Sequence, residues 1–153
     1  MKRLSLFMLT LMLIASCSED PIPLINLEEG EAFLAKNANE EGVNRIEQGL
    51  QYSIIETGNA NSMTPSLENS ITAHFHGTLI NGDVFWSSVD LNEPLTIELS
   101  KLIVGCQKVI SLMKTGDKWR VFIHPSLAYG LEGRPSIPPN AVLIFDIELL
   151  EVI

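Results

Sequence analysis

Cysteine and basic residues are scarce in this sequence, and each shortage excludes a class of protein. Only Cys17 and Cys106 occur among 153 residues, which is too few for a disulfide framework, and their spacing matches no cysteine-based metal site. The 10 lysines and arginines are outnumbered by 19 aspartates and glutamates, so the formal net charge at pH 7 is −9. Because an acidic surface repels phosphate backbones, we expect no nucleic acid partner.

Long hydrophobic runs and common catalytic motifs are also missing. The uncharged apolar run at residues 4–14 is shorter than the about 20 residues that a transmembrane helix needs. The sequence contains no Walker loop, no HExxH and no Ser/His/Asp or Cys/His motif context. His74 and His76 share one strand face, but no carboxylate or cysteine joins them at ligand spacing. We therefore expect neither a metal nor a cofactor.

The first 16 residues have the order of a secretory signal. Lys2 and Arg3 give a positively charged start, the apolar run follows, and the small residues Ala15 and Ser16 come directly before Cys17. A charged start, a short apolar segment and small residues at a cleavage site are typical of a signal peptide. Residues 1–16 are therefore predicted to be removed.

Residues 13–17 resemble a bacterial lipobox, in which Cys17 becomes the lipidated first residue of the mature protein. The acidic residues Glu19 and Asp20 resemble the surface-export signal of Bacteroidetes lipoproteins. The alternative is an ordinary cleaved signal followed by a coincidental cysteine and an acidic tether. The resemblance implies a lipid anchor in the cell envelope of a Gram-negative bacterium, on the periplasmic or the surface side of the outer membrane.

Residues 17–48 are predicted to form a tether and a short helix. Residues 21–30 mix proline with acidic residues, which is typical of a linker. Residues 31–41 contain helix formers, among them Ala32, Phe33 and Ala35, which are able to form one face. Gly42 is the expected end of this helix.

Residues 49–153 are predicted to form one domain of short strands around one helix. Alternating apolar and polar residues predict strands at residues 50–56, 71–76, 83–87, 95–99, 119–123 and 141–150. Between Gly105 and Gly116, Cys106, Ile110 and Met113 recur at helical spacing and predict a short helix with one buried face. This pattern indicates an α+β fold in which an antiparallel sheet wraps around a helix.

The stretch at residues 127–150 is the most informative part of the chain. Residues 129–140 are rich in proline and glycine and are predicted to form a long loop. The strand that follows alternates, with Asp146 and Glu148 on one face and Phe145, Ile147 and Leu149 on the other. A long loop that delivers apolar side chains beside a rigid strand is a common wall of a binding pocket.

Two sequence blocks, at residues 127–150 and 73–88, closely resemble the two signatures of the FKBP family of peptidyl-prolyl isomerases. They read LAYGLEGRPSIPPNAVLIFDIELL and AHFHGTLINGDVFWSS, and they stand in the family order at about the family spacing. The resemblance covers residues 49–152, and several blocks in order are far more specific than one short motif. It implies a strongly twisted antiparallel sheet around one short helix.

The resemblance also implies an activity and a setting. The expected function is cis-trans isomerisation of prolyl bonds in proline-containing polypeptides, without a cofactor, during the folding of exported proteins. Residues 33–43 resemble the junction before the catalytic domain in the macrophage infectivity potentiator subgroup, in which a much longer helical arm makes dimers. Only a stub of that arm is present here, so we expect a monomer.

Individual residues take roles from the same resemblance. Phe85 stands at the family's pocket-wall phenylalanine, and Tyr129 stands at the tyrosine that hydrogen-bonds the ligand's carbonyl. Ile103 matches the isoleucine whose backbone N–H binds the ligand, and Phe145 matches the strand phenylalanine. These four are the expected catalytic residues. Six more are expected to contact the substrate: Phe75, Trp86, Leu95, Leu102, Cys106 and Ile137.

Four of these positions depart from the family pattern. Phe75 replaces a tyrosine and Leu95 replaces a phenylalanine, and both keep an apolar wall. Trp86 replaces an aspartate, so the site loses a negative charge, and Cys106 replaces the tryptophan of the pocket floor. Because an indole is lost beneath the proline ring, we expect a deeper slot and reduced activity.

Two other functions remain open on these residues. The fold could serve as a chaperone or peptide-docking module with little turnover, which the departures at Trp86 and Cys106 favour. It could also be a structural subunit of an envelope machine with a vestigial pocket. Without the resemblance, Phe85 and Phe145 would be read as core residues of alternating strands, and Cys106 as a small buried apolar side chain.

Overall fold

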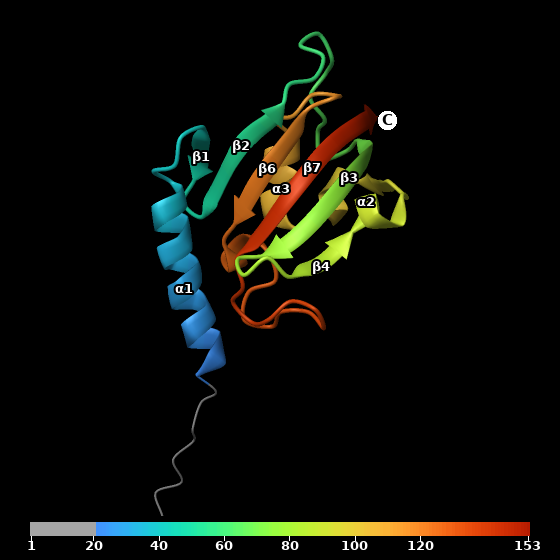
Figure 1. Ribbon diagram of the computed structural model, residues 1–153. Helices are drawn as coiled ribbons and strands as arrows, with labels where there is room; N and C mark the ends of the chain where they lie inside the picture. Colours follow the sequence, from blue (N-terminus) through green and yellow to red (C-terminus); the bar gives the residue numbers. More distant parts are fainter. Residues whose placement is uncertain (1–20) are drawn as a thin grey trace, which may run out of the picture.

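The computed structural model describes residues 21–153, which form one antiparallel sheet with helices on both faces (Figure 1). In chain order the elements are α1 (Ile22–Asn37), β1 (Val43–Glu47), β2 (Leu50–Glu56), β3 (Ser70–Leu79), β4 (Val84–Ser87), α2 (Ser88–Leu91), β5 (Leu95–Glu98), the 3-10 helix η1 (Leu99–Lys101), α3 (Val104–Ile110), β6 (Lys118–Ile123), the 3-10 helix η2 (Pro125–Leu127) and β7 (Leu143–Val152). The sheet has seven strands in the order β1-β2-β6-β7-β3-β4, and β5 pairs with β3. The predicted α+β fold is confirmed.

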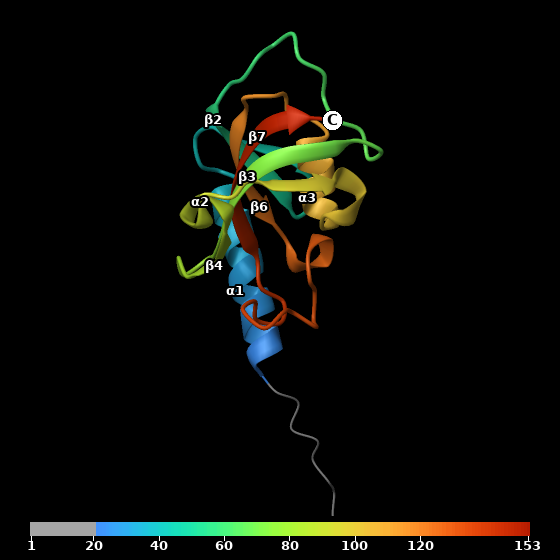
Figure 2. The ribbon, with the colours of Figure 1, turned by 90° about the vertical axis from the view of Figure 1, so that its right-hand side faces the viewer.

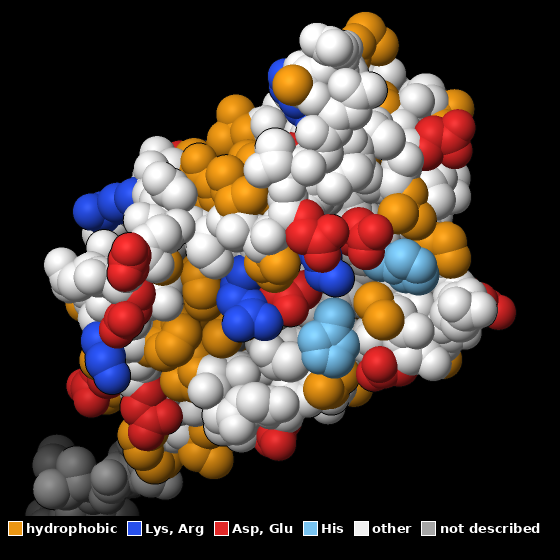
Figure 3. Space-filling view, turned by 45° about the horizontal axis from the view of Figure 1, so that its top comes forward, with side chains coloured by type: hydrophobic (Ala, Val, Ile, Leu, Met, Phe, Trp, Pro, Cys, Tyr) orange, Lys and Arg blue, Asp and Glu red, His pale blue; other side chains and the backbone are white. Residues whose placement is uncertain are grey.

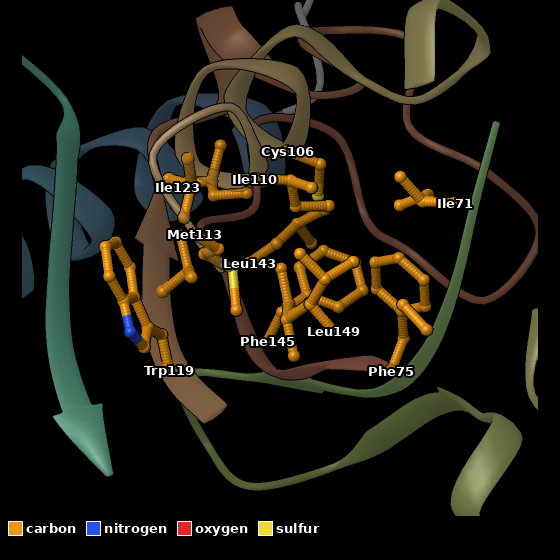
Figure 4. Packing of buried hydrophobic residues seen from close by; sticks show 14 of the residues in the cluster. Ile71, Phe75, Cys106, Ile110, Met113, Trp119, Ile123, Leu143, Phe145 and Leu149 are labelled. Carbon is orange, nitrogen blue, oxygen red and sulfur yellow. The ribbon is translucent and has the colours of Figure 1, made fainter. Parts of the chain in front are cut away.

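One face of the curved sheet encloses α3, and the core lies between them (Figure 2). Along β7, Phe145, Ile147 and Leu149 are buried while Asp146 and Glu148 are partly exposed, as the alternation predicts. Cys106 and Ile110 of α3, with Met113 after it, face the side chains of the strands (Figure 4). The predicted helix is thus present, although it ends at Ile110, before Gly116.

A glycine lets α3 lie this close to the sheet. A Cβ atom on Gly105 would lie 2.5 Å from Cγ2 of Ile123 in β6, closer than two carbon atoms pack. Any other residue at position 105 would push the helix away from the strand. The floor of the cavity described below depends on this approach, because Cys106 is the next residue.

The opposite face of the sheet is polar at its centre. Arg120 of β6 donates two hydrogen bonds to Asp146 of β7, at 2.7 and 2.8 Å, and Lys118 lies 3.9 Å from Glu148. Figure 3 shows acidic and basic side chains beside one another, with histidines near them. Exposed ion pairs of this kind contribute little to stability, so this face mainly keeps the sheet solvated.

The N-terminal segment differs from its prediction. The linker predicted at residues 21–30 is wrong, because α1 begins at Ile22, and it ends at Asn37 rather than at residue 41. Proline misled the prediction: Pro21 caps the helix and Pro23 lies in its first turn, where a missing N–H costs nothing. Of the predicted apolar face, Phe33 packs against Phe122, whereas Ala32 and Ala35 are exposed and the buried residues of α1 are Gly30 and Leu34.

Helix α1 packs against the outer side of the sheet and the loop before β7. Leu34 packs with Phe122 and Val142, and a Cβ atom on Gly30 would lie 2.7 Å from Cγ2 of Val142. At the C-terminal end of the helix, the side chain of Gln51 donates a hydrogen bond of 2.8 Å to the carbonyl of Leu34. The helix is therefore part of the folded body.

Two reciprocal hydrogen bonds join the first turns of α1 to the loop before β7. The Asn26 side chain donates to the Pro139 carbonyl at 2.8 Å, and the Asn140 side chain donates to the Pro23 carbonyl at 3.0 Å. Asn140 has a left-handed backbone, with φ of 55°, which aims its side chain from a turn. The loop predicted from its prolines and glycines is thus fastened at its C-terminal end by α1.

The sheet begins before residue 49. Strand β1, which was not predicted, pairs antiparallel with β2 at the edge of the sheet. Between residues 21 and 153, no helix is long and apolar enough to cross a membrane. The predicted signal peptide and the predicted lipidation at Cys17 lie outside the described residues.

Candidate functional site

A cavity of about 600 Å³ opens between α3, the strands β3, β4 and β7, and the loop after η2. All ten residues predicted for the site in the described chain line it. Four more lining residues were not predicted. The full lining is Phe75, Phe85, Trp86, Leu95, Ile97, Lys101, Leu102, Ile103, Cys106, Tyr129, Arg134, Ser136, Ile137 and Phe145.

Four aromatic rings from three strands form one wall. The ring of Phe145 meets Phe75 edge-on at 6.3 Å between centroids and Phe85 at 5.3 Å, with interplanar angles of 82° and 88°. The Trp86 indole lies 6.0 Å from Phe75 and is 38% exposed, so it belongs to the rim. Edge-to-face aromatic packing holds the rings in defined orientations.

Gly77 of β3 makes room for this wall. A Cβ atom at position 77 would lie 2.4 Å from Cζ of Phe85 and 2.9 Å from Cε1 of Phe145. The two rings therefore occupy the space that any other side chain would need. Packing of these rings therefore explains why the sequence block at residues 73–88 has a glycine at position 77.

Cys106 forms part of the floor. It lies in the first turn of α3, is 2% exposed, and packs in the same cluster as Phe75 and Phe145 (Figure 4). Burial raises the pKa of the Cys106 thiol to about 12, so the sulfur is a neutral thiol at physiological pH. The prediction of a small buried apolar side chain is confirmed, and nucleophilic chemistry by a thiolate is not supported.

Backbone and hydroxyl groups supply the polar side of the cavity. Ile103 is the N-cap of α3, with φ of −60° and ψ of 150°, and a helix leaves the N–H groups of its first positions without partners. The side chain of Gln107 donates to the carbonyl of Leu102 at 2.6 Å, which fixes the backbone just before Ile103. An N–H held in this way can donate to a carbonyl in the cavity.

Tyr129 lies in the loop after η2, with its hydroxyl-bearing ring against the cavity. The guanidinium of Arg134 lies over this ring, 4.7 Å from its centroid, which is a cation–π contact. Arg134 and Ile137 exchange backbone hydrogen bonds of 2.8 and 2.9 Å, so the loop doubles back. Gly133 permits this turn with φ of +61°, since a Cβ there would lie 2.4 Å from the Ile137 carbonyl.

The charged groups that line the cavity are both cations, Lys101 and Arg134. Within residues 21–153, no three His, Cys, Asp or Glu side chains lie where they could hold a metal ion. His74 and His76 instead lie 3.0 Å from the hydroxyls of Ser88 and Ser87 through their Nδ1 atoms. The cavity can thus hold an apolar ring among aromatic side chains while an N–H and a hydroxyl bind flanking carbonyls.

Comparison with known proteins agrees with this geometry. The family described as "FKBP-type peptidyl-prolyl cis-trans isomerase" matches residues 61–150, and the "domain amino terminal to FKBP-type peptidyl-prolyl isomerase" matches residues 24–54. The latter match covers most of α1, all of β1 and most of β2, so these elements belong to a known arrangement that the sequence prediction had divided at residue 49.

Relatives and solved structures were found over most of the chain. FKBP-type peptidyl-prolyl cis-trans isomerase FkpA of Aeromonas hydrophila is 43% identical over 83% of this chain and 47% of its own length. Outer membrane protein MIP of Legionella longbeachae is 39% identical over 83% of this chain and 54% of its own length. The crystal structure of FkpA from Escherichia coli superimposes with a TM-score of 0.80 at 37% identity, over 85% of this chain and 60% of that one. The chain thus spans about half the length of these curated relatives.

Proposed function

Because this chain belongs to the FKBP-type peptidyl-prolyl cis-trans isomerases, we propose that it catalyses the isomerisation of prolyl bonds in polypeptides at this cavity. The observation that carries the proposal is the meeting of four aromatic rings, the Ile103 N–H and the Tyr129 side chain around one apolar space. The expected catalytic residues Phe85, Ile103, Tyr129 and Phe145 come from four different segments of the chain.

Rotation about a prolyl bond requires the protein to make or break no covalent bond. The barrier to rotation of a peptide bond is about 18–20 kcal/mol, and X–Pro bonds exchange over tens to hundreds of seconds when uncatalysed. In the twisted amide the nitrogen loses its conjugation with the carbonyl. A dry, shaped slot that fits the twisted form better than either planar form lowers the barrier, without a nucleophile or a metal.

The residues of the cavity have separate parts in this mechanism. The proline ring would lie among Phe75, Phe85 and Phe145, where edge and face contacts with the rings exclude water. The Tyr129 hydroxyl would donate to the carbonyl of the residue before the proline, and the Ile103 N–H would donate to a carbonyl further along the peptide. The first hydrogen bond holds the carbonyl side of the prolyl bond and the second holds the backbone on its other side while the bond turns.

We further propose that the protein works in the cell envelope as a lipid-anchored monomer that assists folding of exported proteins. The charged and apolar signal order, the lipobox-like residues 13–17 and a relative named as an outer membrane protein support the location. Helix α1 packs on its own domain, which supports a monomer. The N-terminal segment before α1 is short, so a lipid at Cys17 would hold the domain near the bilayer surface.

A second function is favoured by the floor of the cavity. Cys106 is smaller than the tryptophan that the family resemblance places at this position, and Trp86 adds an exposed apolar surface at the rim. Both features suit a peptide-binding module with slow turnover. A structural role in an envelope machine has no comparable support from the described residues.

Two assays on the purified protein separate these functions. A protease-coupled assay with short X–Pro peptides measures isomerisation, and delayed aggregation of an unfolded client measures binding. Isomerisation above the uncatalysed rate that disappears in Phe85→Ala supports the enzyme. An unchanged isomerisation rate at micromolar protein, together with delayed aggregation, would refute catalysis and leave the binding module.

A further inference from the structure

The charge of the cavity is opposite to the charge of the chain. The sequence has 19 acidic and 10 basic residues, yet no carboxylate is among the residues that line the cavity, whereas Lys101 and Arg134 are. Trp86 occupies the rim with an uncharged ring. Among the side chains that line the cavity, a bound peptide would therefore meet positive charges and no negative charge.

The two cations differ in how far they are neutralised. Lys101 lies 3.4 Å from Glu98, and both side chains are well exposed. Arg134 forms no ion pair with any residue between 21 and 153. Asp83, Glu132 and Arg134 also line a neighbouring groove, but neither carboxylate forms an ion pair with Arg134. Arg134 is thus the uncompensated charge of the site.

The position of Arg134 is set by its surroundings. Its guanidinium lies over the Tyr129 ring, 4.7 Å from the centroid, and its backbone is fixed by the two hydrogen bonds with Ile137. In the proposed function, the Tyr129 hydroxyl binds the carbonyl of the residue before the proline. The side chain of that residue is attached to the Cα atom next to this carbonyl, so it would lie close to the Tyr129 ring, whose face Arg134 covers.

We propose that the site selects polypeptides with an acidic residue directly before the proline, because Arg134 binds that carboxylate. The inference rests on the proposed function for the position of the peptide, and it adds the class of substrate. Arginine suits this contact because its planar group can stack on an aromatic ring and still donate hydrogen bonds to a carboxylate.

The test compares peptides that differ only before the proline: Glu-Pro, Gln-Pro, Lys-Pro and Leu-Pro. The quantity measured is the ratio of kcat/KM for the Glu and Gln peptides, since these side chains have nearly the same shape. We expect a ratio of about 2 to 5, as is usual for a partly exposed charge pair, and a Lys-Pro peptide turned over more slowly than Gln-Pro. Adding 0.5 M salt should bring the ratio close to one.

Variants of Arg134 test whether this residue causes the preference for Glu-Pro over Gln-Pro. Arg134→Gln should abolish it, and Arg134→Lys should retain part of it, because the charge remains while the planar group that stacks on Tyr129 is lost. Arg45→Gln removes an exposed arginine from β1, at the other end of the sheet, and should leave the ratio as in the parent protein. The ratio compares two peptides on one protein, so a general loss of activity through the Tyr129 contact does not affect it.

Each outcome decides one of the two proposals. Turnover of all four peptides with a ratio near one, or a preference that survives Arg134→Gln, overturns the acidic substrate and leaves the isomerase intact. Absence of turnover on every peptide overturns the isomerase. The same ratio is then measured as dissociation constants of labelled peptides, and equal binding of the Glu and Gln peptides would refute the acidic preference.

Discussion

Replacing Phe145 by leucine should lower the isomerase activity of a protein that remains folded. Leucine keeps an apolar side chain in β7 but removes the ring that contacts Phe75 and Phe85 edge-on. Each such contact contributes about 0.5–1.5 kcal/mol beyond area burial, so two contacts amount to about 1–3 kcal/mol. For a protein of this size, that loss lowers Tm by roughly 2–12 °C.

The effect on activity follows from the position of the ring in the cavity wall. If half or more of that contact energy also acts on the proline ring in the transition state, kcat/KM falls by about 2- to 160-fold, since 1.36 kcal/mol is tenfold in rate. The assay is isomerisation of an X–Pro peptide at 10 °C, far below the melting transition, with Tm measured on the same preparation. The expected result is a folded protein with low activity.

Phe122→Leu is the matched control. Phe122 and Phe145 are both 6% exposed, and Phe122 also contacts another ring, Phe33 at 6.0 Å, but it lies on the face of the sheet that α1 covers. It should lose stability and keep kcat/KM. Equal losses of activity in the two variants would show that the aromatic wall acts only through stability, and a fully active Phe145→Leu would refute its role in the site.

Other predictions concern the anchor, the thiol and α1. Cys17→Ser should release the protein from membranes, and membrane retention after carbonate washing would contradict lipidation at this residue. Burial raises the pKa of the Cys106 thiol from 9.0 to about 12, so the neutral thiol stabilises the fold below pH 9 and this stabilisation should be lost between pH 9 and 12. Unfolding followed by fluorescence measures the free energy of unfolding over this pH range. The variant Cys106→Ala is the control, because it should lack this pH dependence. Asn26→Ala should lower stability by about 0.5–1.5 kcal/mol and speed amide hydrogen exchange in residues 133–141, whereas Asn39→Ala, which removes a bond within the N-terminal segment, should leave that exchange unchanged.

The sequence predicted the elements and site residues that have a periodic pattern or belong to a family motif. Strands β3, β6 and β7 were predicted because one face of each is buried, which imposes alternation. The ten cavity residues were found through the family resemblance over residues 49–152, and spacing alone could not have joined Phe85, Cys106 and Tyr129. Such residues meet only through the pairing of strands that are distant in sequence.

The elements and residues that the sequence did not predict were missed for physical reasons. Strand β1 lies at the edge of the sheet with a mixed burial pattern, so it lacks the alternation that identifies a central strand. Arg134 was overlooked because its place depends on Gly133 and on a backbone turn toward Ile137, and neither produces a periodic signal. A signal was available for α1, since proline at a helix start followed by a run rich in Leu and Glu favours a helix.

The hydrogen bonds between α1 and the loop before β7 connect the first turns of α1 mechanically to the wall of the cavity. Helix α1 has 16 residues, so its axis extends about 24 Å from its first turn to β1. Tension applied ahead of Ile22 meets the hydrogen bonds at Pro139 and Asn140 before it meets any strand of the sheet. Those residues follow Ile137, which lines the cavity, so a force applied at the first turn of α1 would be transmitted to the cavity wall through this loop.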